Sequence, residues 1–98
     1  MIRSFKNEGT EDVFNGVDSK AARKVCPTNL TAVAQKKLDW VDAAKILDDL
    51  KAPLSNRLEK LKGDRAGQYA IRINGQYRIC FTWSDGGAGQ VEIVDYHS

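Results

Sequence analysis

Two stretches near the C-terminal end, residues 69–73 and 77–83, constrain the fold of this chain more than any other feature. Large apolar side chains occupy every second position in both, which is the period of a β-strand with one buried face. The Asn-Gly pair between them favours a hairpin turn. A two-residue loop would pair apolar with basic positions, whereas an odd-length loop or a bulge aligns the apolar faces. We therefore expect an odd loop that places Arg72 and Arg78 together on the opposite face.

The first part of the chain shows short helical patterns. Residues 2–5 alternate in polarity and predict an edge strand before the first glycine. Thr10 is the expected cap of a short helix that stops at Gly16. Residues 19–25 predict a second short helix. The clearest helix is expected over residues 29–44.

The main helix has an apolar stripe at three- and four-residue steps. It consists of Leu30, Val33, Ala34, Leu38 and Val41. Lys36 and Lys37 fall mostly on the other side, so we expect them to be exposed. The connecting segment that follows is expected to be anchored to the core by Leu54, Leu58 and Leu61.

These patterns together predict an α+β fold in a single domain, residues 1–98. It would have an N-terminal strand, two to four helices, and a C-terminal antiparallel sheet with helices packed on one face. Residues 85–89 (Asp-Gly-Gly-Ala-Gly) are expected to form a loose turn before a last strand at 91–94. The sheet face without helices is expected to be open and basic.

Composition narrows the class of protein. The chain has no apolar run of about eighteen residues, the length that spans a membrane. Residues 1–20 carry charge throughout and lack the apolar centre of a signal peptide, so we expect a cytoplasmic protein. Cys26 and Cys80 are far apart and are expected to be free thiols. One histidine and scattered acidic residues make a poor metal site, so we expect no metal and no cofactor.

Positive charge is concentrated in residues 57–78, which hold six Lys and Arg against two acidic residues, or +4. Such a segment suits a polyanion, because each cation near a phosphate releases counterions. Arg72, Arg78 and Lys62 could neutralise a phosphate whose charge grows during a reaction. On charge alone, a solvated basic face is an equally good interpretation.

The C-terminal residues add groups that can move protons. His97 is the one histidine, and its ordinary pKa lies near neutrality. Asp95 and Glu59 are further proton acceptors, and Tyr96 can stack on a base. A single terminal histidine is more often a surface residue than a catalyst, so these residue types by themselves only suggest a site.

Four motifs in the second half of the chain carry a family resemblance. They are L-K-G-D-R-A-G-Q-Y at 61–69, R-I-N at 72–74, Y-R-I-C-F at 77–81 and V-D-Y-H at 94–97. With the opening I-R-S-F they resemble HigB-type toxins of the RelE/ParE superfamily, over nearly the whole chain. The resemblance implies a RelE-like fold and the toxin of a type II toxin–antitoxin module, neutralised by a HigA-like helix-turn-helix antitoxin. It also implies cleavage of mRNA in the ribosomal A site.

The implied reaction needs no metal, since the ribose 2′-OH attacks the adjacent phosphorus and leaves a 2′,3′-cyclic phosphate. The resemblance assigns catalytic roles to His97, Asp95, Tyr96, Arg78 and Lys62. Glu59 stands where some members have a histidine, and it is the sixth expected catalytic residue. RNA contacts are expected from Arg72, Arg65, Lys60, Arg57 and Asn74. Some members carry an arginine at the position of Asn74.

Two other functions remain open at this point. ParE-like toxins resemble this fold but bind DNA gyrase, and fold alone does not separate the two activities. A non-catalytic RNA- or protein-binding module is the second alternative. The Asp-Tyr-His terminus and the basic hairpin favour the nuclease.

Overall fold

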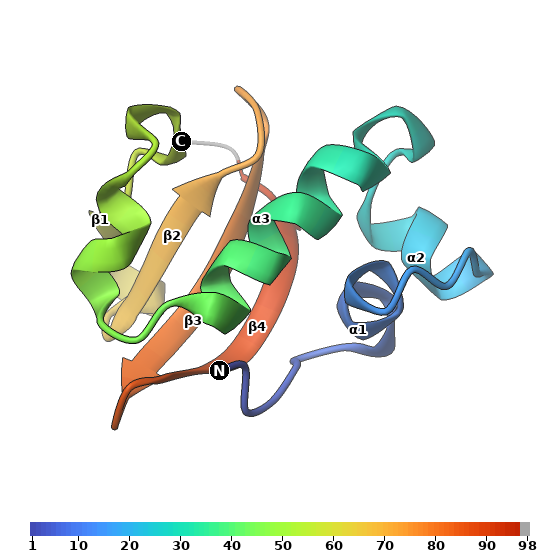
Figure 1. Ribbon diagram of the computed structural model, residues 1–98. Coiled ribbons are helices and arrows are strands. Elements are labelled where there is room, and N and C mark those ends of the chain that lie inside the picture. Colours follow the sequence, from blue (N-terminus) through green and yellow to red (C-terminus); the bar gives the residue numbers. More distant parts are fainter. Residues whose placement is uncertain (97–98) are drawn as a thin grey trace.

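The computed structural model describes residues 1–96, which form an α+β fold as predicted (Figure 1). The helices are α1 (Glu8–Phe14), α2 (Lys20–Val25) and α3 (Thr31–Ala43). The strands are β1 (Glu59–Lys60), β2 (Gln68–Arg72), β3 (Tyr77–Ser84) and β4 (Gly87–Asp95). They form one antiparallel sheet in the order β1-β2-β3-β4. Four 3-10 turns connect these elements, at Thr28–Leu30, Leu47–Lys51, Leu54–Asn56 and Gly63–Arg65.

The predicted N-terminal strand is present as two isolated bridges beside β4. Ile2 pairs with Ala88 and Phe5 with Val91, both in parallel orientation. An irregularity in β4 around Gln90, whose φ is +50°, lies between the two bridges and interrupts a continuous ladder. Residues 2–5 therefore cover the edge of β4 without forming a full strand.

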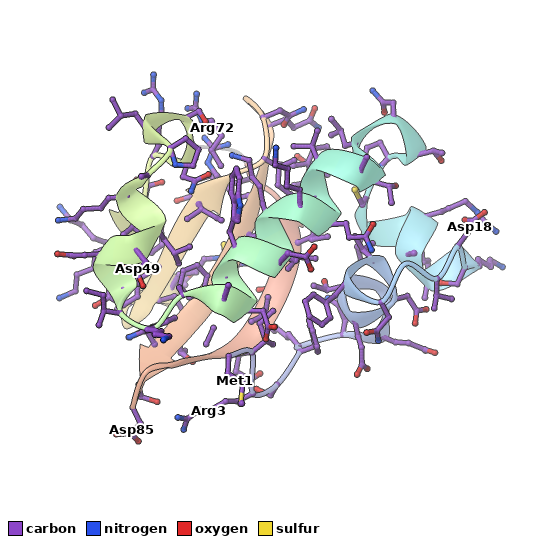
Figure 2. The ribbon with its side chains drawn as sticks, in the orientation of Figure 1. Met1, Arg3, Asp18, Asp49, Arg72 and Asp85 are labelled. Atoms are coloured by element: carbon purple, nitrogen blue, oxygen red, sulfur yellow. The ribbon has the colours of Figure 1, made fainter. Side chains whose placement is uncertain are left out.

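The turn before β4 helps to hold the N-terminal segment in place (Figure 2). The Arg3 guanidinium donates to the carbonyl of Asp85 at 2.5 Å. Asp85 and Gly86 both have positive φ, and Ser84 pairs with Gly87. This is a tight two-residue hairpin turn, so the prediction of a loose turn at 85–89 was wrong and β4 starts earlier than expected.

The first helix starts before its predicted cap. Asn7 caps α1, its side-chain oxygen accepting from the backbone N–H of Thr10 at 2.9 Å. Thr10 lies inside the helix, fully buried, and its hydroxyl accepts from the N–H of Ile93 at 3.0 Å. Thr10 therefore links α1 to β4 in the core and does not cap the helix. The expected second helix is confirmed as α2, with Ser19 as its cap.

The main helix is confirmed as α3, but its buried stripe is rotated relative to the prediction. Ala34, Leu38 and Val41 are fully buried as expected, whereas Val33 is 41% exposed. Lys37, predicted to be exposed, is only 7% exposed. At 3.6 residues per turn, position 37 lies closer to the axis of the stripe than position 33 does. Position 37 faces the core, and a lysine there needs a partner.

The hairpin register agrees with the prediction. Ile71 pairs with Ile79 and Arg72 with Arg78, and residues 74–76 form the odd-length loop. The apolar face of this hairpin packs against the helices. On the other face Leu61, Ala70 and Cys80 form a small buried cluster. The face expected to be open and basic is therefore partly apolar, and its cationic part is the end near the hairpin loop.

The three leucines predicted to anchor the connecting segment differ in burial. Leu61 is buried and Leu58 is half-buried, but Leu54 is 89% exposed, so the prediction was wrong for Leu54. No helix in residues 1–96 is long and apolar enough to cross a membrane.

Cys80 gives the fold a measurable dependence on pH. Both cysteines are free, as predicted, and both are buried; burial raises the pKa of the Cys80 thiol from 9.0 to about 11. Between these values the unfolded chain loses the thiol proton while the folded chain keeps it. The free energy of unfolding should therefore fall as pH rises from about 9 to about 11. In urea titrations across this range, Cys80→Ala should show a shallower fall than the unmodified chain. Equal slopes would contradict the assignment.

Candidate functional site

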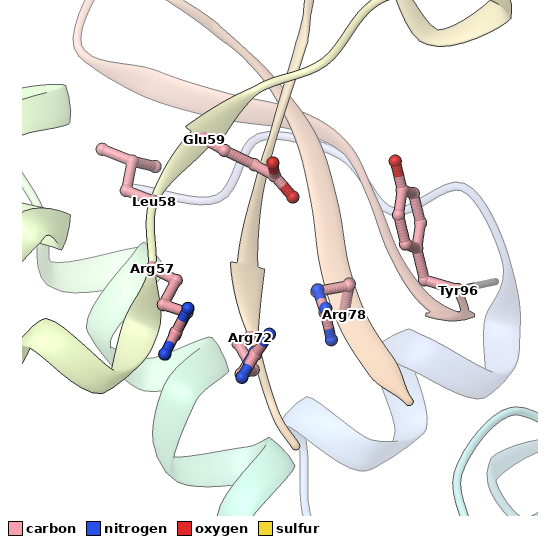
Figure 3. Close-up of a pocket in the computed structure, with 6 residues that line it drawn as sticks. All are labelled: Arg57, Leu58, Glu59, Arg72, Arg78 and Tyr96. Carbon is pink, nitrogen blue, oxygen red and sulfur yellow. The ribbon is translucent and has the colours of Figure 1, made fainter. Parts of the chain in front are cut away.

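A pocket of about 510 Å³ opens on the sheet face away from the helices. It is lined by Arg57, Leu58, Glu59, Arg72, Arg78 and Tyr96. Figure 3 shows the three guanidinium groups in a row across the sheet, with the Glu59 carboxylate pointing over the same area and the Tyr96 ring at one end. The pocket thus combines three cations, one carboxylate and one aromatic ring.

Arg72 lies at the centre of this charge. Burial, together with the charges of Arg57 and Arg78, lowers its pKa, and the Glu59 carboxylate opposes that shift. Its Nε is buried and has no hydrogen-bond partner among residues 1–96. A buried donor normally has an acceptor, and like charges opposite each other on a sheet repel. An anion bound between the arginines would relieve both conditions.

Arg78 is held by the hairpin loop and by the ring of Tyr96. Its Nη1 donates to the carbonyl of Asn74 at 2.7 Å and to that of Tyr77 at 3.3 Å. The Tyr96 ring centroid lies 5.6 Å from its Cζ, within cation–π range. The Asn74 side chain accepts from the N–H groups of Gln76 and Tyr77 at 2.9 and 2.7 Å, which closes the loop. The guanidinium is therefore held on a rigid turn.

Arg57 enters the pocket from a backbone turn that is fixed by the buried side chain of Asn56. Its φ of +46° is in the left-handed region, and its N–H donates to the Leu54 carbonyl at 3.1 Å. The preceding residue, Asn56, is fully buried and accepts from the Lys37 ammonium at 2.7 Å. Its amide nitrogen donates to the carbonyls of Leu50 and Ala52 at 3.2 and 3.4 Å. Burial, with the charge of Lys36, lowers the pKa of Lys37. This buried lysine–amide pair gives Arg57 a defined position.

Comparison with known proteins identifies the family. A family model described as the RelE-like toxin HigB of type II toxin–antitoxin systems matches residues 3–97. Toxin HigB-1 of Vibrio cholerae is 38% identical over 88 residues, which is 90% of each chain. This chain belongs to the HigB toxin family. Endoribonuclease HigB of Proteus vulgaris is 30% identical over 99% of this chain and 100% of its own.

Solved structures share the fold of this HigB-family chain. The YoeB–YefM complex from Staphylococcus aureus contains a chain that matches with a TM-score of 0.60, covering 100% of this chain and 99% of that one at 16% identity. The YoeB dimer from the same organism also gives 0.60 at 16% identity. The RelE-like fold expected from the sequence is thus confirmed.

The structure brings together five of the predicted site residues: Arg57, Glu59, Arg72, Arg78 and Tyr96. Asp95 is outside this group. It pairs with Tyr77, so its side chain projects from the opposite face to Arg78. Both of its carboxylate oxygens accept from the Gln76 amide at 3.1 Å.

Lys60 and Lys62, which precede β2, do not line the pocket. Lys60 pairs with Tyr69, so it points away from the face of Glu59. Lys62 is exposed in the following loop. His97 lies outside the described residues. In residues 1–96, no three His, Cys, Asp or Glu side chains come together in a way that could hold a metal ion.

Arg65 is an ion-pair partner of Glu92 within this HigB-family fold. Its Nη1 lies 2.8 Å from the Glu92 carboxylate and 3.1 Å from the Gln68 side-chain oxygen. The hydrogen bond to Glu92 raises the pKa of Arg65. Glu92 also accepts from Lys6 at 3.4 Å and is only 9% exposed. Arg65 thereby fastens the basic loop to β4.

Sequence reasoning did not identify three supporting residues: Asn56, Gln76 and Glu92. For Glu92 a signal existed, since it alternates with Val91 and Ile93 and so had to lie on the site face. Asn56 and Gln76 carried no such signal, because Lys37 and Asp95, their side-chain partners, are each 19 residues away in the sequence and only the fold brings them close.

The buried pair beneath Arg57 can be tested by its effect on stability. Asn56→Ala leaves the Lys37 ammonium buried without its acceptor and should lower the free energy of unfolding by about 3 kcal/mol. Ser55→Ala, at the exposed neighbouring position, is the matched control and should change it by less than about 0.5 kcal/mol. Urea unfolding measures both. Similar values for the two variants would show that the Lys37–Asn56 contact contributes little.

Proposed function

We propose that this chain is a metal-independent endoribonuclease that cuts mRNA in the ribosomal A site and so inhibits translation. The observation that carries the proposal is the convergence of three guanidinium groups, one carboxylate and an aromatic ring on a single open pocket. The name of the Proteus vulgaris relative, an endoribonuclease, supports it. Forked guanidinium donors are suited to phosphate oxygens, and an aromatic ring to an unstacked base.

The proposed reaction is the one that the family resemblance implies, and the groups in the pocket fit it. The ribose 2′-OH attacks the adjacent phosphorus, its proton passes to an acceptor, and the bond from phosphorus to the 5′-oxygen breaks. The leaving 5′-oxygen takes up one proton, so the products are a 2′,3′-cyclic phosphate and a 5′-OH. Glu59 lies in the pocket as a proton acceptor. His97 remains the proposed donor to the leaving oxygen, and the arginines stabilise the negative charge that grows on the phosphate.

We propose that the ribosome supplies the contacts that orient the RNA, which the pocket by itself does not provide. The pocket is open and contains few groups that could orient a ribose and two bases. Binding energy from remote contacts is commonly needed to align a reacting phosphodiester. The exposed Lys60 and Lys62 are available for such contacts beyond the pocket. This arrangement favours RNA that is already held in an extended form.

A HigA-like antitoxin with a helix-turn-helix domain is the proposed partner, and the cytoplasm the proposed location. Toxin–antitoxin complexes among the solved structures of the same fold support a partner of this kind. A protein that acts on translating ribosomes must be kept inactive where it is made. A short downstream reading frame encoding such an antitoxin would support the assignment.

Arg78 and Lys60 form a matched pair for testing the site. Arg78→Ala should lower the rate of mRNA cleavage by about 100-fold, since it removes a fixed donor to the phosphate. Lys60→Ala should lower it by less than about threefold, because its side chain points away from the pocket. Primer extension on mRNA from cells expressing each variant, and from ribosomes programmed in vitro, measures this. Equal losses would favour diffuse charge over a placed site.

The product ends test the proposed chemistry. Cleaved mRNA should carry a 2′,3′-cyclic phosphate or its hydrolysed phosphate, and a 5′-OH that polynucleotide kinase can label without prior dephosphorylation. The purified protein should cut naked transcript much more slowly than mRNA on ribosomes. Fragments with 5′-phosphate ends, or equal rates on naked transcript, would contradict the mechanism.

The alternatives predict other outcomes in the same cells. DNA breaks without cuts in translated codons would indicate a ParE-like action on gyrase. Toxicity that survives His97→Gln would indicate a non-catalytic binding module.

A further inference from the structure

The hairpin loop at residues 74–76 holds the end of β4 through two contacts and Arg78 through a third. The Gln76 amide donates to both carboxylate oxygens of Asp95 at 3.1 Å. The Gln76 carbonyl accepts from the N–H of Tyr96 at 2.8 Å. The Asn74 carbonyl accepts from Arg78 at 2.7 Å, and the Tyr96 ring lies over that guanidinium. One loop therefore fixes both Arg78 and Tyr96.

The register of β4 separates Asp95 from its neighbours. Val94 pairs with Arg78, and Asp95 pairs with Tyr77, so the side chains of Asp95 and Arg78 leave the sheet on opposite faces. Tyr96 lines the pocket and Asp95 does not. A carboxylate on the far face is poorly placed to take a proton from a ribose bound beside Arg78, because proton transfer needs hydrogen-bond distance.

We propose that Gln76 and Asp95 are positioning residues: their hydrogen bond holds the end of β4 so that the Tyr96 ring stays over Arg78. The proposal rests on the nuclease function argued above. It gives Asp95 a role different from the catalytic one expected by family resemblance, and it gives Gln76 a role that the sequence did not suggest. Both side chains are exposed, so their substitution leaves the core intact.

Exchanging the two groups tests this directly. Gln76→Glu places two carboxylates together, and Asp95→Asn places two amides together with only one acceptor oxygen at position 95. Each single variant should lower the rate of mRNA cleavage on ribosomes by about tenfold, equivalent to about 1.4 kcal/mol. The double variant Gln76→Glu/Asp95→Asn has the same side-chain lengths, with donor and acceptor exchanged. It should recover activity to within about threefold of the unmodified chain, at unchanged pH dependence.

A catalytic Asp95 predicts the opposite result. The double variant would then stay as inactive as Asp95→Asn, and the pH–rate profile of both would lose one limb; either result would overturn the positioning role. Asp18→Asn is the control for removal of an exposed carboxylate, since Figure 2 shows Asp18 at the far end of the molecule from Arg72. It should leave cleavage unchanged.

Failure of the proposed function gives a distinct pattern. If mRNA from cells expressing the unmodified chain carries no cuts beyond those in cells without it, the nuclease itself is wrong. If Arg78→Ala is inactive and the exchanged pair shows no recovery, only the positioning role is wrong. Circular dichroism and urea unfolding of each variant should match the unmodified chain, because neither side chain is buried.

Discussion

The pairing of Arg72 with Arg78 across the β2–β3 hairpin is the constraint on which the site depends. Burial of one hairpin face against the helices fixes the register, since a slip by one residue would turn every side chain to the other face. The same register forces two arginines into opposite positions on the remaining face. Repulsion between them is the cost of this arrangement, and the packing on the other side supplies the free energy that sustains it. The protein therefore keeps a concentrated positive charge on this face.

Hydrogen bonds hold the backbone before Arg57 and the guanidinium of Arg78 in defined positions. Arg57 stands on a turn held by the buried Asn56–Lys37 contact, and Arg78 is bound to the carbonyls of the hairpin loop. Donors that are already oriented need not reorganise when charge develops in a transition state, which is why fixed groups contribute more than mobile ones. Lys60 and Lys62 are exposed and have no such supports among the hydrogen bonds of residues 1–96; under the proposed function they would attract RNA through salt-dependent charge.

A buried lysine without a carboxylate partner is an expensive feature for a chain of this size. Lys37 is surrounded by the core, its acceptor is a neutral amide, and the Trp40 ring centroid lies 5.6 Å from its ammonium. Burying this ammonium lowers the free energy of unfolding, but its hydrogen bond to Asn56 fixes the segment that leads into Arg57. Arg65 and Glu92 do the same for the loop that follows β1, through a partly buried ion pair. Both contacts connect elements that hydrophobic packing alone would leave loosely placed.

Local periodicity and the need to bury one face were enough to predict the α+β class, the hairpin with its odd loop, and the position of Arg72 and Arg78 on one face. The family motifs in the sequence also indicated the fold and the toxin family. Three features could be learned only from the folded chain: Lys37 is buried, Glu92 forms an ion pair with Arg65, and Asp95 lies on the far side of the strand from Arg78. These outcomes depend on contacts between residues distant in the chain and on the register of β4, which periodicity does not encode. Long-range packing, not residue type, selected which charged groups reach the pocket and which hold the fold together.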